Sequence, residues 1–78
     1  MTSGPVVPEP TTPADAARQA LARTGHRWLQ RVEVFAGVGW AVLRGDVQSF
    51  YLKQLAQATV LALPDVARLR NDLRVIRG

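Results

Sequence analysis

Apolar residues recur at helical spacing in the first patterned segment of the chain. Thr12 is a suitable N-cap, Pro13 fits the first helical position, and Asp15 follows three residues after the cap. Gly25 is a natural stop after the last turn. These signals predict a helix over residues 13–24 that packs on the core through a thin apolar stripe. The stripe consists of Ala14, Ala17, Leu21 and Thr24.

Two runs with a period of two follow a connector at residues 26–30. The first run spans residues 31–36 and the second spans residues 40–47, and every second residue in each is apolar or small. The sequence Gly-Val-Gly at residues 37–39 supplies a turn between them, so the two runs predict a β-hairpin. The face that we expect to point inward comprises Val32, Val34, Ala36, Ala41, Leu43, Gly45 and Val47.

A second helical pattern precedes a third strand pattern. Ser49 is placed to cap a helix over residues 50–63, and Pro64 ends it. The inward face of this helix would carry Leu52, Leu55, Ala56, Thr59 and Leu63. The period then returns to two over residues 67–76, which predicts a third strand. Its inward positions would be Ala67, Leu69, Asn71, Leu73 and Val75.

The order of these elements predicts an α/β domain of the α+β kind with an αββαβ arrangement. Each strand has only one apolar side, so both helices are expected on one face of a three-stranded mixed sheet. The chain of 78 residues has room for one such domain, over residues 13–78. Residues 1–12 contain three prolines among small polar residues, which predicts a flexible tail. The pattern leaves the strand order in the sheet open.

Composition limits the chemistry more than the compartment. The chain has no cysteine, which excludes disulfide bonds and thiolate zinc sites. Its N-terminus lacks the basic and apolar regions of a signal peptide, and no apolar stretch approaches the ~20 residues needed to cross a bilayer. We therefore expect no signal peptide in the chain as written, and the localisation stays open.

Catalytic chemistry has little support in the sequence. The one histidine, His26, lies in the connector, where a solvated residue is far more common than a general base. The six carboxylates are scattered without the spacing of a metal site or an acid–base pair. We therefore expect a non-catalytic protein that needs neither a metal nor a cofactor.

Four short features occur in a fixed order in the second half of the chain. They are Leu43-Arg44-Gly45-Asp46-Val47, a helix that contains Lys53 and Ala56, Val66 in a turn, and Asn71-Asp72-Leu73-Arg74-Val75. With the predicted elements, they resemble the BON domain, the bacterial OsmY and nodulation domain, over about residues 14–76. One departure is Asp65, where the family usually has glycine, which accepts a left-handed backbone more readily. The resemblance implies a module that associates with phospholipid or the cell envelope, found in osmotic-stress and secretion proteins and often periplasmic.

Two residues of these motifs have structural explanations. Gly45 lies in the inward register of its strand, where a missing side chain would let a helix approach closely. Asn71 lies among inward apolar residues, so we expect its amide to satisfy backbone groups at a strand irregularity.

The sheet face opposite the helices is the candidate binding surface. Strand alternation places aromatic and apolar residues there, near the hairpin turn and amid arginines. The candidate residues are Phe35, Trp40, Val42, Arg31, Arg44, Arg68, Arg70 and Arg74. Such a mixture suits a membrane interface, an acidic protein groove or stacked nucleotide bases. Two plainer interpretations stay open, namely an ordinary charged face on the third strand and a Trp40 side chain folded over the sheet.

Phe50 and Lys53 form a secondary surface on the polar side of the second helix, where packing is the alternative role. Nine arginines and one lysine against six acidic residues give a formal net charge of +4, which is compatible with an anionic partner. With the resemblance, the leading hypothesis is an anionic phospholipid or another envelope component. Binding to other protein domains is the alternative. Single-stranded nucleic acid is less favoured, because the chain has no glycine-rich clamp loop, and the oligomeric state stays open.

Overall fold

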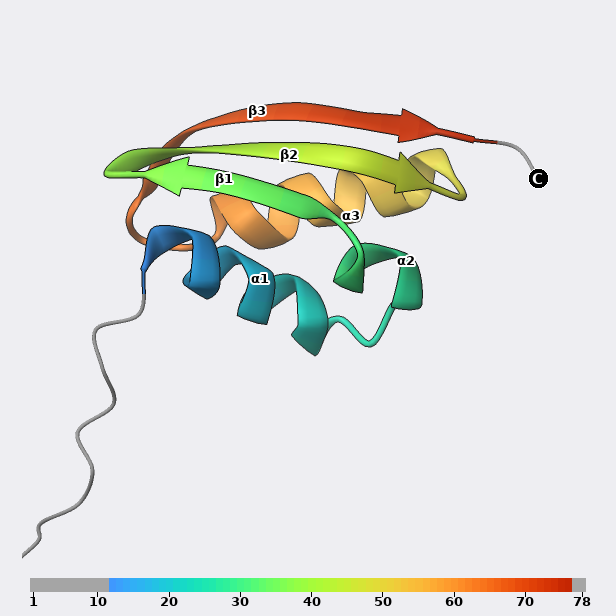
Figure 1. Cartoon of the computed structure of the whole chain (residues 1–78), viewed down its shortest axis with the longest axis horizontal. Coiled ribbons are helices and arrows are strands. Elements are labelled where there is room, and N and C mark those ends of the chain that lie inside the picture. The colour runs from blue at the N-terminus through green and yellow to red at the C-terminus, as the bar shows by residue number, and fades with distance from the viewer. Residues whose placement is uncertain (1–11, 77–78) are drawn as a thin grey trace, which may run out of the picture.

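The computed structural model describes residues 12–76 as three helices and three strands (Figure 1). In chain order these are α1 Pro13–Arg23, α2 Arg27–Gln30, β1 Glu33–Gly37, β2 Gly39–Val47, α3 Phe50–Leu61 and β3 Val66–Val75. The predicted αββαβ order is confirmed, with the short helix α2 added between α1 and β1. Of the predicted flexible tail, only Thr12 lies within the described residues.

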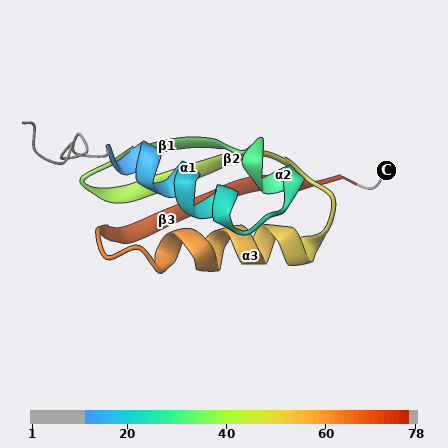
Figure 2. The same cartoon turned by 90° about the horizontal axis from the view of Figure 1, so that it is seen from below.

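The strand β2 lies at the centre of the sheet, with β1 and β3 at its two edges. It pairs antiparallel with β1 across the hairpin and parallel with β3. Parallel pairing requires a crossover, and α3 makes it. The helices α1 and α3 lie along one face of the sheet, and the opposite face is left uncovered (Figures 1 and 2). The predicted mixed sheet with both long helices on one face is therefore confirmed.

The core lies between the sheet and the helices. Its buried residues come from every helix and strand, and none of those within residues 12–76 is polar or charged. They are Ala17, Leu21, Leu29, Val32, Val34, Ala41, Leu43, Val47, Leu52, Ala56, Val60 and Leu73. Removal of this apolar surface from water is the main force that holds the helices against the sheet.

Side-chain caps begin both long helices, as predicted. The Thr12 hydroxyl oxygen accepts a hydrogen bond from the backbone N–H of Asp15 at 3.1 Å. The Ser49 hydroxyl oxygen accepts one from the backbone N–H of Leu52 at 3.3 Å. Each cap satisfies an N–H group that has no partner within its own helix, and so fixes where the helix begins.

The predicted boundaries around α2 and at the end of α3 are wrong. The connector at residues 26–30 is mostly the helix α2, whose Leu29 is buried in the core. A helix of four residues is too short to show a helical period in the sequence. As a result β1 begins at Glu33, and Arg31 is the C-cap of α2 and not a strand residue. The helix α3 ends at Leu61, before the predicted residue 63, because the residue preceding a proline disfavours α backbone.

The first part of β3 contains an irregularity that the alternation did not predict. Val66 and Arg68 pair with adjacent residues of β2, so Ala67 is the extra residue of a bulge. Ala67, which was expected to point inward, is exposed for this reason. Val75 was also expected inward, but it lies at the last position of the strand and is exposed there.

Asn71 joins β3 to α3 through its side-chain amide. Its Nδ2 donates to the Lys53 carbonyl at 3.0 Å and to Gln57 Oε1 at 3.3 Å. Its Oδ1 accepts from the backbone N–H of Leu73 at 3.1 Å. The prediction that this amide satisfies backbone groups is confirmed, and the Lys53 carbonyl in α3 is one of them. The strand irregularity expected at Asn71 is wrong, because β3 pairs with β2 in continuous register there.

Gly45 is required by its backbone and not by a close helix. Its φ is +136°, a value that residues with a side chain rarely adopt. A Cβ atom at this position would meet Val32 Cα at 3.7 Å and Leu73 Cδ2 at 3.9 Å, which are ordinary contacts. The predicted close approach of a helix is therefore wrong, and the positive φ explains the glycine.

The Asn71 contacts give a test of the fold. We expect Asn71→Ala to lower the free energy of unfolding by about 1–3 kcal/mol, because the substitution leaves partly buried backbone groups without partners. Urea unfolding followed by circular dichroism would measure the change. The matched control is Gln54→Ala, on the exposed side of α3, the helix that Asn71 contacts. This substitution should change the free energy of unfolding by no more than about 0.5 kcal/mol. Equal effects of the two substitutions would contradict a structural role for the amide.

Candidate functional site

Cross-strand pairing divides the uncovered face of the sheet into two halves. Two rows next to the hairpin turn cross the three strands, and they are Gly37–Trp40–Arg68 and Phe35–Val42–Arg70. The rows further along the sheet are Glu33–Arg44–Asp72 and then Asp46 beside Arg74. We call the first two rows the apolar half and the remaining positions the charged half. The apolar half contains no acidic residue, whereas the charged half contains three.

The Trp40 indole lies over the end of β1. A Cβ atom on Gly37 would come within 2.5 Å of Trp40 Nε1, so the indole occupies the space above the glycine backbone. The interpretation that Trp40 folds over the sheet is thus confirmed, but it does not hide the ring. Trp40 remains 44% exposed, so part of a large apolar surface is open to the solvent.

Two more apolar side chains extend this surface toward the tip of the hairpin. Phe35 is 46% exposed on β1, and Val38, which lies between the two strands, is 96% exposed. Val42 is half-buried between Phe35 and Arg70. An exposed group of apolar residues of this kind is a common mark of an interaction surface, whereas single exposed apolar residues are not.

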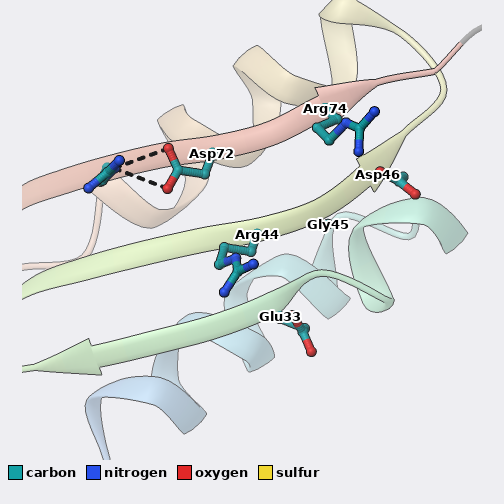
Figure 3. A pocket seen from close by; sticks show the side chains of 7 residues that line it. Glu33, Arg44, Gly45, Asp46, Asp72 and Arg74 are labelled. Carbon is teal, nitrogen blue, oxygen red and sulfur yellow. Dashed lines mark hydrogen bonds and ion pairs between the residues drawn. The ribbon is translucent and has the colours of Figure 1, made fainter.

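The charged half, together with Arg70 of the adjoining row, forms a shallow hollow of about 510 Å³ on the uncovered face (Figure 3). Its lining residues are Glu33, Arg44, Gly45, Asp46, Arg70, Asp72 and Arg74. Arg70 Nε lies 3.0 Å from Asp72 Oδ2 and 3.1 Å from Asp72 Oδ1, which makes one defined ion pair. Three arginines face three carboxylates here, so the hollow carries no excess charge that would select an anion.

The structure brings together most of the predicted binding surface. Phe35, Trp40, Val42, Arg44, Arg68, Arg70 and Arg74 all lie on the uncovered face, where the alternation placed them. Arg31 does not belong there, because it caps α2 before the first strand begins. Of the secondary surface, Phe50 is 61% exposed at the start of α3. Lys53 lies one turn further along the same helix, away from the uncovered face.

Two features of the surface were not predicted. Val38 is exposed at the hairpin tip. The sequence indicates this position, because Val38 is a single apolar residue between the two glycines of the predicted turn. Arg27 and Trp28 line a small hollow together with Arg31 on the short helix α2. Arg27 and Arg31 are four residues apart, a spacing that makes two side chains neighbours on a helix. The sequence would have predicted this pair only if residues 26–30 had been recognised as helical.

Neither a metal cluster nor a membrane-spanning helix occurs in the described part of the chain. Within residues 12–76, no group of three or more histidine, cysteine or acidic side chains is placed to hold a metal ion. None of the helices in that range is long and apolar enough to cross a membrane.

No model of a known protein family matches the chain, and no curated protein matches it. The likeness to the BON domain therefore rests on the four sequence features and on the order of helices and strands.

The contact between Gly37 and Trp40 can be tested by substitution. We expect Gly37→Ala to displace the indole, because the new Cβ would overlap it, and to lower stability by no more than about 1 kcal/mol, because the half-exposed ring can move aside. In a Trp28→Phe background, the emission of Trp40 should shift to longer wavelength as the ring moves into water. The control is Val38→Ala, which changes an almost fully exposed side chain and should leave the emission unchanged. Identical spectra for Gly37→Ala and its parent would show that the indole does not lie on the glycine.

Proposed function

We propose that this protein is a non-catalytic binding module that attaches to an anionic phospholipid surface through the apolar half of its uncovered sheet face. One observation carries the proposal. Exposed apolar side chains at the hairpin end lie in the same two rows as Arg68 and Arg70, and those rows contain no acidic residue.

The apolar half combines the two kinds of contact that a membrane interface offers. Trp40 and Phe35 have large apolar surfaces suited to the boundary between headgroups and acyl chains, and the indole N–H can remain hydrogen-bonded there. Val38 at the tip of the hairpin would enter first. Arg68, which forms no ion pair within residues 12–76, would keep its guanidinium group at the level of the phosphates, since long cationic side chains extend toward water. Arg70 would exchange its ion pair with Asp72 for a phosphate.

The charged half determines which end of the face meets the lipid. Its three carboxylates would lie against anionic headgroups if the whole face were applied flat to the membrane. Contact through the hairpin end avoids this repulsion, because the acidic residues then lie further from the surface. The distribution of charge thus supports a tilted attachment in which the turn between β1 and β2 approaches the membrane.

The resemblance to the BON domain supports the same function, because that family is associated with phospholipid and the cell envelope. A bacterial envelope or periplasmic protein with a role in osmotic stress would fit this assignment. The net charge of +4 also favours association with an anionic surface at low ionic strength.

Protein–protein assembly is the second candidate, and the position of β3 favours it. This strand of ten residues is at the edge of the sheet, where another strand could add. Three arginines and Asp72 alternate along it, and charged side chains on an edge disfavour pairing with a second chain. We therefore rank assembly below lipid attachment.

Vesicle co-sedimentation tests the proposed function. We expect binding to vesicles that contain phosphatidylglycerol, little binding to pure phosphatidylcholine, and weaker binding as salt is raised. Phe35→Ala and Trp40→Ala should each reduce the affinity by about tenfold. The double substitution Arg68→Gln with Arg70→Gln should reduce it by at least about fivefold, at about 1 kcal/mol for Arg68 and less for Arg70, which is paired with Asp72.

Two matched controls make the result specific to this surface. Phe50→Ala removes an even more exposed phenyl ring from α3, 61% against 46% for Phe35, and should leave vesicle binding unchanged. Arg18→Gln with Arg23→Gln removes the same charge from α1 and should have a smaller effect than the β3 pair. Failure to bind anionic vesicles at low salt would refute the lipid proposal. Concentration-dependent sedimentation of the protein alone, or salt-sensitive binding of single-stranded RNA, would then favour the alternatives.

A further inference from the structure

We propose that Arg27 and Arg31, with Trp28 beside them, form a second binding site that takes a phosphate group. This site lies on α2, at the end of the molecule away from the hairpin turn (Figure 1). It uses none of the residues of the apolar half, so it stands independently of the function proposed above.

The two guanidinium groups come from residues four apart on helical backbone, so they lie on adjacent turns. Arg27 is the first residue of α2, and Arg31 follows its last residue with φ −98° and ψ −1°, so the backbone is still helical in form at that point. Side chains four residues apart on a helix are neighbours, with Cβ atoms roughly 5–6 Å apart. Arg27, Trp28 and Arg31 line a hollow of about 190 Å³. Both arginines are exposed, so a ligand can reach them from solvent.

No carboxylate of residues 12–76 neutralises this hollow. Neither Arg27 nor Arg31 forms an ion pair within residues 12–76, and no acidic residue lines the hollow. The hollow on the uncovered face differs, because there three carboxylates accompany three arginines. Two like charges on adjacent turns repel each other, and an anion between them removes that repulsion.

The excess positive charge of the protein lies mainly outside the uncovered face. That face carries four arginines and three acidic residues. The rest of residues 12–76 carries five basic side chains, Arg18, Arg23, Arg27, Arg31 and Lys53, against the two acidic side chains Asp15 and Asp65. Of these, Arg18 is already paired with Asp15 at 2.8 Å. The other four, Arg27 and Arg31 included, form no ion pair within residues 12–76.

The backbone that carries the site is fixed by the core. Leu29 lies between the two arginines in sequence and is almost fully buried, and Trp28 packs against the core from a half-buried position. The backbone N–H of Arg31 donates to the Trp28 carbonyl at 3.3 Å, which closes the turn. Binding therefore orders only two side chains, and less conformational entropy is lost than in a mobile loop.

A phosphate group fits this arrangement better than other common anions. Guanidinium groups bind phosphate oxygens in pairs, and two of them can hold one phosphate from two sides. A carboxylate offers only two oxygens, and chloride offers no directional acceptor. A free phosphate ester and a lipid headgroup share this chemistry, and the experiment below separates them.

Trp28 fluorescence tests the site directly. In a Trp40→Phe variant, Trp28 is the only tryptophan, and its emission would be followed during titration with inorganic phosphate or with chloride at equal ionic strength. We expect a saturable change with phosphate and none with chloride. Arg27→Gln with Arg31→Gln should weaken the phosphate response by about tenfold or more. The matched control, Arg18→Gln with Arg23→Gln, should weaken it by no more than about twofold. Calorimetric titration of the unsubstituted protein with phosphate provides a second measurement.

The outcomes separate this site from the apolar half and separate its two possible ligands. Equal responses to phosphate and chloride, or equal losses in the two double variants, would overturn the site. If the double variant Phe35→Ala with Trp40→Phe still shows the change in Trp28 emission with phosphate, the α2 site is supported even when the protein does not bind vesicles. Vesicles of phosphatidylglycerol that change Trp28 emission, with loss of this change in the Arg27 and Arg31 variant, would identify a lipid headgroup as the ligand. A response to glycerol phosphate but not to the vesicles would identify a soluble phosphate ester.

Discussion

The parallel pairing of β2 with β3 constrains the rest of the molecule. Two neighbouring parallel strands cannot be joined by a hairpin, so the chain must return along the full length of the sheet before β3 begins. The helix α3 makes that return, and it packs mainly against β3. Asn71 then fixes the relative position of helix and strand, since its amide bonds to α3 on one side and to β3 on the other.

The same constraint explains why the protein has two very different sides. The helices α1 and α3 lie on one face of the sheet (Figure 2), and the apolar side chains of that face are buried against them. The other face receives no cover, and its side chains must be compatible with water or with a partner. The register then places the apolar and the charged residues of this face at opposite ends. The short helix α2 carries Arg27, and Arg31 follows as its C-cap; neither forms an ion pair within residues 12–76, and both lie at the end remote from the hairpin.

Periodicity was sufficient to predict every long element and the layered arrangement, because an alternating strand and an amphipathic helix each have one apolar side. It failed at α2, where four residues hold a single buried leucine and no repeat. That failure misplaced Arg31 on the sheet and concealed its proximity to Arg27. The bulge at Ala67 was also invisible, since the sequence on both sides of it alternates without interruption.

For the candidate surface, too, the sequence predicted some features and not others. Strand alternation assigned Phe35, Trp40 and the β3 arginines to one face without any knowledge of strand order. The separation into an apolar half and a charged half depends on the register between three strands, which no local pattern encodes. The position of the indole over Gly37 likewise depends on a cross-strand pair that only the folded hairpin creates.

The hydrogen bond that Asn71 accepts from the backbone of Leu73 also affects how the protein behaves when it is concentrated. An edge strand is a template for aggregation because its backbone donors are open to another chain. In β3 one of these donors is already taken by a side chain of the same strand. A single amide thus contributes to solubility as well as to folding, and its loss would leave a longer run of the edge open to strand addition.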